Sequence, residues 1–152
     1  MVSVFPKYNA SNFPIDDPAF PAIEIINLGG VLAAYGKAFY NGSINLPSGT
    51  WTNLVSLTLT LPRCLAVISF YCGSNHASTN IEISVRVLIN GASYPDLTLP
   101  LENPAGYIHD QGSKTTIYEL EAGDYTFKMQ AQARGSNSWV FLPTLVVLAF
   151  TR

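Results

Sequence analysis

Hydrophobic and polar residues alternate one by one along three stretches of the chain, residues 56–61, 81–89 and 125–134. In the first stretch, leucines at every second position are separated by serine and threonine. Successive side chains of a β-strand point to opposite faces of a sheet, so this period of two predicts strands with one buried face. Asn90-Gly91 ends the second stretch, and this dipeptide is a strong signal for a tight hairpin turn.

Shorter apolar runs predict five more strands, which makes about eight in all, around residues 35–40, 64–71, 94–99, 115–120 and 140–150. No helical period of useful length occurs, and strands that lack crossover helices must pair antiparallel. The predicted fold class is therefore all-β: a single antiparallel, jelly-roll-like β-sandwich over residues 28–152.

Residues 1–27 follow a different pattern, in which four of the ten prolines stand between scattered apolar residues. Proline lacks an N–H donor and disfavours helix before it, so this segment is predicted to be an extended N-terminal arm. At about 3.1 Å per residue the arm reaches ~80 Å, beyond a domain some 35–40 Å wide. Because free tails are polar, we expect its apolar side chains to bind a partner: Phe5, Pro6, Tyr8, Phe13, Pro14, Ile15, Phe20 and Ile23. In the alternative, the arm folds back over the core of the β domain of its own chain.

Two predicted strands, residues 64–71 and 140–150, are apolar on both faces. In an antiparallel sandwich one face of each sheet is ordinarily in water, so a doubly apolar strand indicates that the outer face is covered as well. A neighbouring subunit, the arm or long loops of the same domain could provide this cover. We favour a subunit interface. The candidate residues that line it are Val140, Leu142, Val146, Leu148, Leu65 and Val67; in the last strand, the opposite face is the alternative.

Charged residues make up only 12% of the 152 residues, about half the usual share of roughly 25%. The net charge of −2 includes no basic stripe, which argues against nucleic acid as a partner. A chain so poor in charge is weakly protected against association, so we expect a homo-oligomer, a trimer above all. No run of about 18 apolar residues predicts a membrane span, and the first residues lack the features of a secretory signal, so synthesis in the cytoplasm of the producing cell is expected.

Cys64 and Cys72 are eight residues apart on one predicted strand. At about 3.3 Å per residue they lie ~26 Å from each other, far beyond the ~7 Å limit between the Cα atoms of a disulfide. Both are therefore predicted to be free thiols, which is typical of a protein made in a reducing compartment.

Residues capable of catalysis are few. His109, Asp110 and Ser113 have the residue types of a catalytic triad, but they form a local cluster without a nucleophile elbow. Cys72 with His76 supplies only two metal ligands, and Asp16-Asp17 supplies too few for calcium. We therefore expect no enzymatic activity, no metal and no cofactor. Trp51, Asn53, Asn137 and Trp139 stand near predicted turns and are the candidates for a sugar site, although Trp there is more often a core or interface anchor.

The arm reads VFPKYNASNFPIDDPAFP, and it precedes a small β domain that is poor in charge. In length and layout the whole chain resembles the trimeric decoration proteins, also called auxiliary or cement proteins, of thermophilic long-tailed bacteriophages. The resemblance implies a trimer on the exterior of the virion, whose arms clamp neighbouring capsomers of the major capsid protein. The competing hypothesis is a trimeric jelly-roll head of a tail fibre that binds a glycan or protein receptor.

Overall fold

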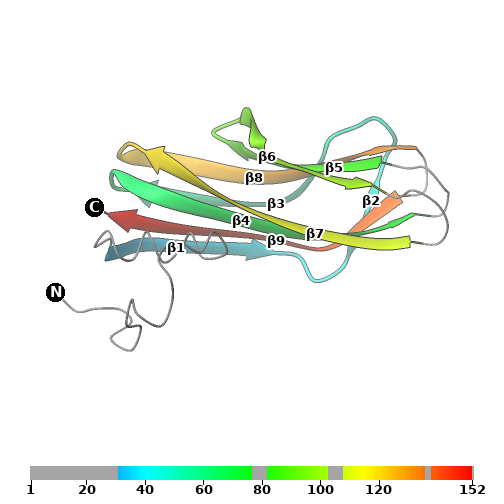
Figure 1. The fold of residues 1–152 in the computed structure, drawn as a ribbon, viewed down its shortest axis with the longest axis horizontal. Helices are drawn as coiled ribbons and strands as arrows, with labels where there is room; N and C mark the ends of the chain where they lie inside the picture. The colour runs from blue at the N-terminus through cyan, green and yellow to red at the C-terminus, as the bar shows by residue number, and fades with distance from the viewer. Residues whose placement is uncertain (1–30, 77–81, 103–107, 136–137, 152) are drawn as a thin grey trace, which may run out of the picture.

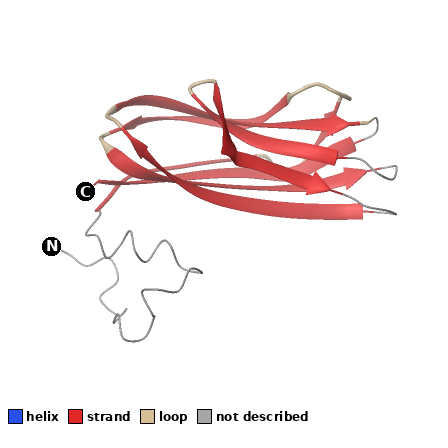
Figure 2. Cartoon of the chain, turned by 45° about the horizontal axis from the view of Figure 1, so that its top comes forward, coloured by secondary structure: helices blue, strands red, loops and turns tan. Residues whose placement is uncertain are grey.

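The computed structural model describes residues 31–76, 82–102, 108–135 and 138–151. The arm over residues 1–27 and its candidate binding residues lie outside this part of the chain. Among the described residues the structure consists of strands and their turns, without helix (Figure 2). These strands are β1 (Val31–Phe39), β2 (Ser43–Leu46), β3 (Thr52–Leu61), β4 (Cys64–His76), β5 (Glu82–Ile89), β6 (Ala92–Glu102), β7 (Ile108–Leu120), β8 (Gly123–Arg134) and β9 (Ser138–Thr151).

The strands form two stacked sheets (Figure 1). One has the order β1-β9-β4-β7, with β2 also paired to β9, and the other has the order β3-β8-β5-β6. β1 pairs with one half of β9 and β2 with the other half, so these two act as one interrupted strand. If β1 and β2 are counted as one strand, that strand pairs with β9, β3 pairs with β8, β4 with β7, and β5 with β6. This nested antiparallel pairing is a jelly roll, which confirms the predicted fold class.

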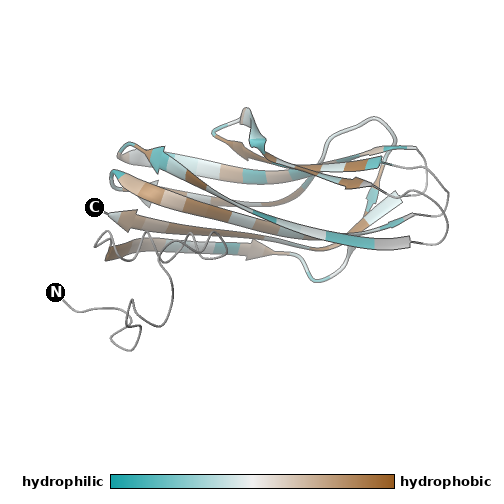
Figure 3. Cartoon of the chain, viewed as in Figure 1, coloured by the Kyte–Doolittle hydropathy of each residue, from teal (hydrophilic) through white to brown (hydrophobic). Residues whose placement is uncertain are grey.

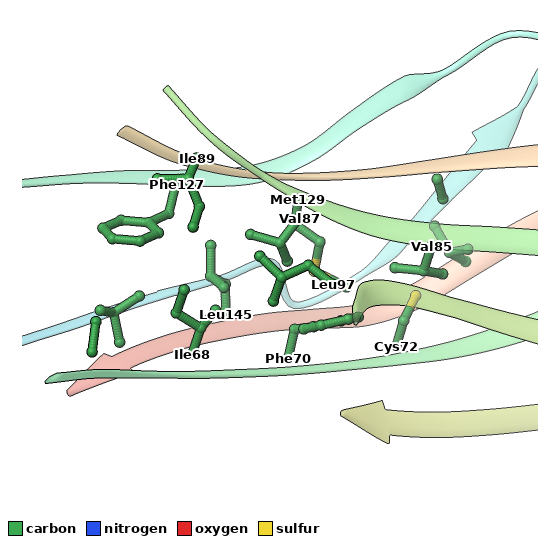
Figure 4. Close-up of a cluster of buried hydrophobic side chains, with 14 of the residues drawn as sticks. Ile68, Phe70, Cys72, Val85, Val87, Ile89, Leu97, Phe127, Met129 and Leu145 are labelled. Atoms are coloured by element: carbon green, nitrogen blue, oxygen red, sulfur yellow. The ribbon is translucent and has the colours of Figure 1, made fainter. Parts of the chain in front are cut away.

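The core lies between the two sheets, where each contributes the side chains of one face (Figure 4). Ile68 and Phe70 of β4 face Val87, Phe127 and Met129 of the other sheet, and all five are almost fully buried. The alternation predicted for β3, β5 and β8 is confirmed, because the positions predicted to face inward are buried or half-buried. No helix in the described stretches is long and apolar enough to cross a membrane.

Two strands are longer than the sequence predicts. The sequence predicts strands around residues 64–71 and 115–120, but β4 and β7 pair along their whole lengths, from Cys64 with Leu120 to His76 with Ile108. The ladder satisfies the backbone of each residue irrespective of its side chain, so pairing overrides the weak strand propensity of Gly73, Ser74 and Asn75.

Cys64 and Cys72 are free and buried on the inner face of β4, which confirms the prediction of free thiols. Burial raises the pKa of Cys72 to about 12 and also raises that of Cys64. At neutral pH both side chains are therefore neutral, and they act as small hydrophobic residues of the core.

A β-bulge in β9 changes the face to which its side chains point. Before the bulge, Ser138 and Val140 are buried, whereas after it Leu145, Val147 and Ala149 are buried. Leu142 occupies the bulge with a φ of 49°, in the left-handed region. The prediction that grouped Val140 with the surface residues of β9 is therefore wrong for this residue: its side chain is 0% exposed and lies in the core.

Candidate interaction surface

The outer face of the five-stranded sheet carries apolar side chains in rows that run across its strands. In one row Tyr35 of β1 pairs with Leu148 of β9, which pairs with Val67 of β4, which pairs with Ile117 of β7. The adjacent row contains Leu32, Phe150 and Leu65 and ends at Glu119. Since paired residues share a face, these apolar side chains lie on one face of the sheet, which we call the apolar face: Leu32, Tyr35, Phe39, Leu65, Val67, Ile117, Val146, Leu148 and Phe150. The same register places Lys37, Ser69, Thr115 and Thr144 on this face as well.

Exposure on this face is greatest toward its β1 side. Phe39 is 63% exposed, Tyr35 57% and Leu32 46%, while Val67 in the middle of the sheet is buried by its neighbours at 9%. Figure 3 shows hydrophobic residues along β4, the strand that crosses the centre of this sheet. Exposed patches of this kind on a folded domain mark interaction sites, because apolar surface gains stability only when it leaves water.

The outer face of the other sheet is polar by comparison. Its side chains include serine, threonine, lysine and glutamine, which pair across strands, as Thr58 does with Thr126 at 3.2 Å. Arg86 donates from Nε and Nη2 to Gln130 Oε1 at 3.1 and 2.9 Å, and its guanidinium lies 3.7 Å from the centre of the Trp51 ring. Gln130 Nε2 in turn donates to Asn53 Oδ1 at 2.8 Å. The outer face of this sheet is thus the more polar of the two.

The sheet edges show the same asymmetry. β1 and β3 lie together at one side of the sandwich, where Gly36 of β1 packs against Leu57 and Leu59 of β3. β3 has no charged residue and β1 has only Lys37. The edge strands of the opposite side, β6 and β7, carry prolines or charges of the kind that discourage pairing with another chain: Pro95, Asp96, Pro100, Asp110, Lys114 and Glu119. The β3 edge lacks this protection, and the β1 edge has only Lys37.

The structure separates the residues predicted for an oligomer interface into three groups. Leu65, Val67, Val146 and Leu148 lie together on the apolar face. Leu142 lies at the bulge, 43% exposed, and Val140 lies in the core. The exposed residues of this surface outside β4 and β9 are Leu32, Tyr35, Phe39 and Ile117, and none of them was predicted from the sequence. A signal was available for three of them, since β1 is apolar at both odd and even positions.

Of the residues considered for catalysis, the side chains of His76 and His109 lie outside what the structure describes. Asp110 Oδ1 accepts a bond from the backbone N–H of Gln111 at 2.7 Å, and no group of three or more described His, Cys, Asp or Glu residues is placed to hold a metal ion. Tyr118 donates to Asp96; burial above all, and then this bond and the charge of Asp96, raise the pKa of Tyr118. Its hydroxyl therefore stays protonated as a donor that ties β7 to β6.

Comparisons with known proteins support the fold. No family model matches the chain, and no curated protein matches it. Among solved structures, a chain from infectious bursal disease virus Gx strain is similar, with a TM-score of 0.52 and 10% identity over 77% of this chain and 32% of that one. The VP2 subviral particle of infectious bursal disease virus has a TM-score of 0.48 and 12% identity, over 77% of this chain and 33% of that one. TmCBM61 in complex with β-1,4-galactotriose has a TM-score of 0.41 and 12% identity, over 78% of this chain and 91% of that one.

The chain spans about a third of the length of the bursal disease virus chains that it matches. Its structural neighbours thus include viral capsid proteins and a carbohydrate-binding jelly-roll module. At these identities the likeness shows the jelly-roll fold alone, since this fold serves both capsids and sugar-binding domains.

Proposed function

We propose that this protein is a structural component of a bacteriophage virion, not an enzyme, and that it binds the outer surface of an assembled capsid as a trimer. It is made in the host cytoplasm and stabilises the shell by clamping neighbouring copies of the major capsid protein through its N-terminal arms. The observation that carries this proposal is the apolar face on one sheet, set against a more polar face on the other.

An apolar face of this extent favours association. Phe39, Tyr35 and Leu32 contribute little to the stability of a lone chain through the parts of their side chains that stay in water. Removing such surface from water is worth roughly 25 cal/mol per Å², so a partner gains stability from every ring that it covers. A face rich in aliphatic and aromatic side chains suits another protein surface, because the cores of protein interfaces have this composition.

The arm adds reach to this surface. Three residues separate the arm from β1, the strand that carries the most exposed side chains of the apolar face. Phe5, Tyr8, Phe13 and Phe20 would each gain from burial in grooves on neighbouring proteins, while the arm's prolines reduce the entropy lost when it is ordered. Because the arm contains few charges, its binding is expected to depend little on salt.

The test is co-sedimentation with empty shells assembled from the major capsid protein that is encoded with this chain. The full chain should pellet with shells at low and high salt alike, and a variant that lacks residues 2–20 should stay in the supernatant while its β domain remains folded by circular dichroism. A variant with Lys7 and Asp16 replaced by alanine serves as the control, because it changes the arm's charges but leaves its apolar residues in place. Failure of the full chain to pellet, or equal binding by the truncated chain, would refute the clamping role.

One observation favours the receptor-binding alternative. Trp51 with Arg86, Gln130 and Asn53 forms an ordered aromatic and amide cluster on the polar sheet face, and sugars bind surfaces that combine a ring with planar hydrogen-bonding groups. In a variant with Trp139→Phe, Trp51 is the single tryptophan. Its fluorescence on titration with oligosaccharides from the host cell wall measures binding directly, and an unchanged spectrum at millimolar sugar would dismiss this alternative.

A further inference from the structure

Leu142 combines two features that a residue serving only its own fold seldom has. Its φ is 49°, in the left-handed region where an L-residue other than Gly, Asn or Asp is strained, and its side chain is 43% exposed. Only one other described non-glycine residue has a positive φ, Asn90, which occupies a hairpin turn where this residue type is favoured.

The backbone of the bulge does not require a leucine. Leu142 N–H donates to Gly42 O at 3.1 Å, and Leu142 O accepts from Thr144 Oγ1 at 3.2 Å. A glycine would make the same bonds without strain, because it enters the left-handed region freely. Whatever favours leucine at this position must therefore involve its side chain, and nearly half of that side chain lies in solvent.

Two exposed aromatic residues lie beside Leu142 in the sheet register. Phe39 pairs with Thr144, and Tyr40 N–H donates to Pro143 O at 3.1 Å. Phe39 is 63% exposed and Tyr40 46%. The Tyr40 ring lies against Gly42, where an added Cβ would be 2.8 Å from Cε1 of the ring, so its position depends on the glycine. We call this group of Phe39, Tyr40 and Leu142 the β1 corner.

We propose that the β1 corner is the anchor of the contact between two copies of this chain, with Leu142 inserted into the neighbouring copy. This inference rests on the proposed function, in which copies associate, and it identifies where they touch. Strain held in the backbone of an exposed residue is a feature of sites that bind, since a docked side chain compensates for the strain in the assembled state.

The size and charge of the corner and its surroundings fit a second copy. With aromatic side chains of ~200 Å² each, the exposed parts of Tyr35, Phe39 and Tyr40 amount to ~330 Å². An interface of ordinary size buries about 800 Å² on each partner, of which ~450 Å² is apolar, so these rings with Leu142 and Leu32 supply most of that share. Lys37 is the single charge on β1, and it lies 5.3 Å from the centre of the Phe39 ring, so two copies meet without a block of like charges.

The test compares the full chain with Leu142→Gly and Leu142→Asn by analytical ultracentrifugation over a range of concentrations, together with the melting temperature under conditions where the chains are dissociated. Both variants should weaken association at least tenfold. Neither should lower the melting temperature of the dissociated chain, because glycine and asparagine relieve the strain at φ 49°.

Asn90→Gly is the matched control, since Asn90 has the same φ of 49° but lies in the hairpin turn between β5 and β6 of the other sheet. It loses the bond that the Thr126 N–H donates to its Oδ1 at 2.8 Å, so it should lower the melting temperature and leave association unchanged. Three results would overturn the inference: wild-type association retained by Leu142→Gly, a lower melting temperature of dissociated Leu142→Gly, or a wild-type chain that stays monomeric. A trimer whose association is unchanged in Leu142→Gly would overturn this inference alone, whereas a monomer that still pellets with shells would also overturn the trimer of the proposed function and leave only its capsid binding.

Discussion

Two adjacent valines of β9 provide a sharp test of which face of this strand is covered by the protein's own core. Val147 is 0% exposed and belongs to the core cluster, whereas Val146 is half-buried on the apolar face. Replacing either by alanine removes the same two methyl groups. At about 0.8 kcal/mol per buried CH₂, with a further contribution from the cavity, Val147→Ala should cost roughly 2–3 kcal/mol.

The assay is urea unfolding at a low protein concentration, where chains are dissociated, and at a high concentration, where they are associated. With a slope of about 1–3 kcal/mol per molar urea, Val147→Ala lowers the midpoint by ~1 M at both concentrations. Val146→Ala costs less than ~1 kcal/mol at low concentration and more at high concentration, where its face is covered. Equal costs for Val146→Ala at the two concentrations would refute the assignment of this face to an interface.

Three further predictions concern the described residues. Gly73→Ala places a Cβ 2.2 Å from Cε2 of the Phe141 ring and so displaces that ring, which should lower the free energy of unfolding in urea by about 1–3 kcal/mol. If a second substitution, Phe141→Ala, does not recover part of the lost stability, the contact is not the cause. Since burial raises the pKa of Cys72 from 9.0 to about 12, its neutral thiol favours the folded state, so stability relative to Cys72→Ala should fall as pH rises above about 9; a flat difference between the two proteins would contradict this. Arg86→Met removes the cation from the Trp51 ring, so the tryptophan emission should change with a loss of about 1 kcal/mol, and identical spectra would argue against the stacking.

Much of the fold could be predicted because alternation is a local signal. The inward positions of β3, β5 and β8 follow directly from a period of two, and a chain without helical periodicity leaves antiparallel pairing as the solution. The lengths of β4 and β7 could not be predicted in this way. Gly73 and Asn75 favour turns by themselves, and only the partner strand, distant in sequence, holds them extended.

The candidate surface was predicted in part for the same reason. Leu65 and Val67 alternate with core residues of β4, so once one face was buried the other had to face outward. Val140 was misplaced because a bulge shifts the alternation by one residue; Pro143, next to Leu142, is the signal for it, since proline within a central strand is confined to bulges. The break between β1 and β2, which faces this bulge, was missed for the same physical reason.

The mass of the full chain in solution tests most directly the claim that its apolar face is covered by protein. Sedimentation equilibrium at micromolar concentration should show a species of three 16.5 kDa chains and no monomer, with little change on adding salt. A stable, monodisperse monomer of 16.5 kDa would contradict the account, because Tyr35, Phe39 and Leu142 would then remain in water without a partner copy.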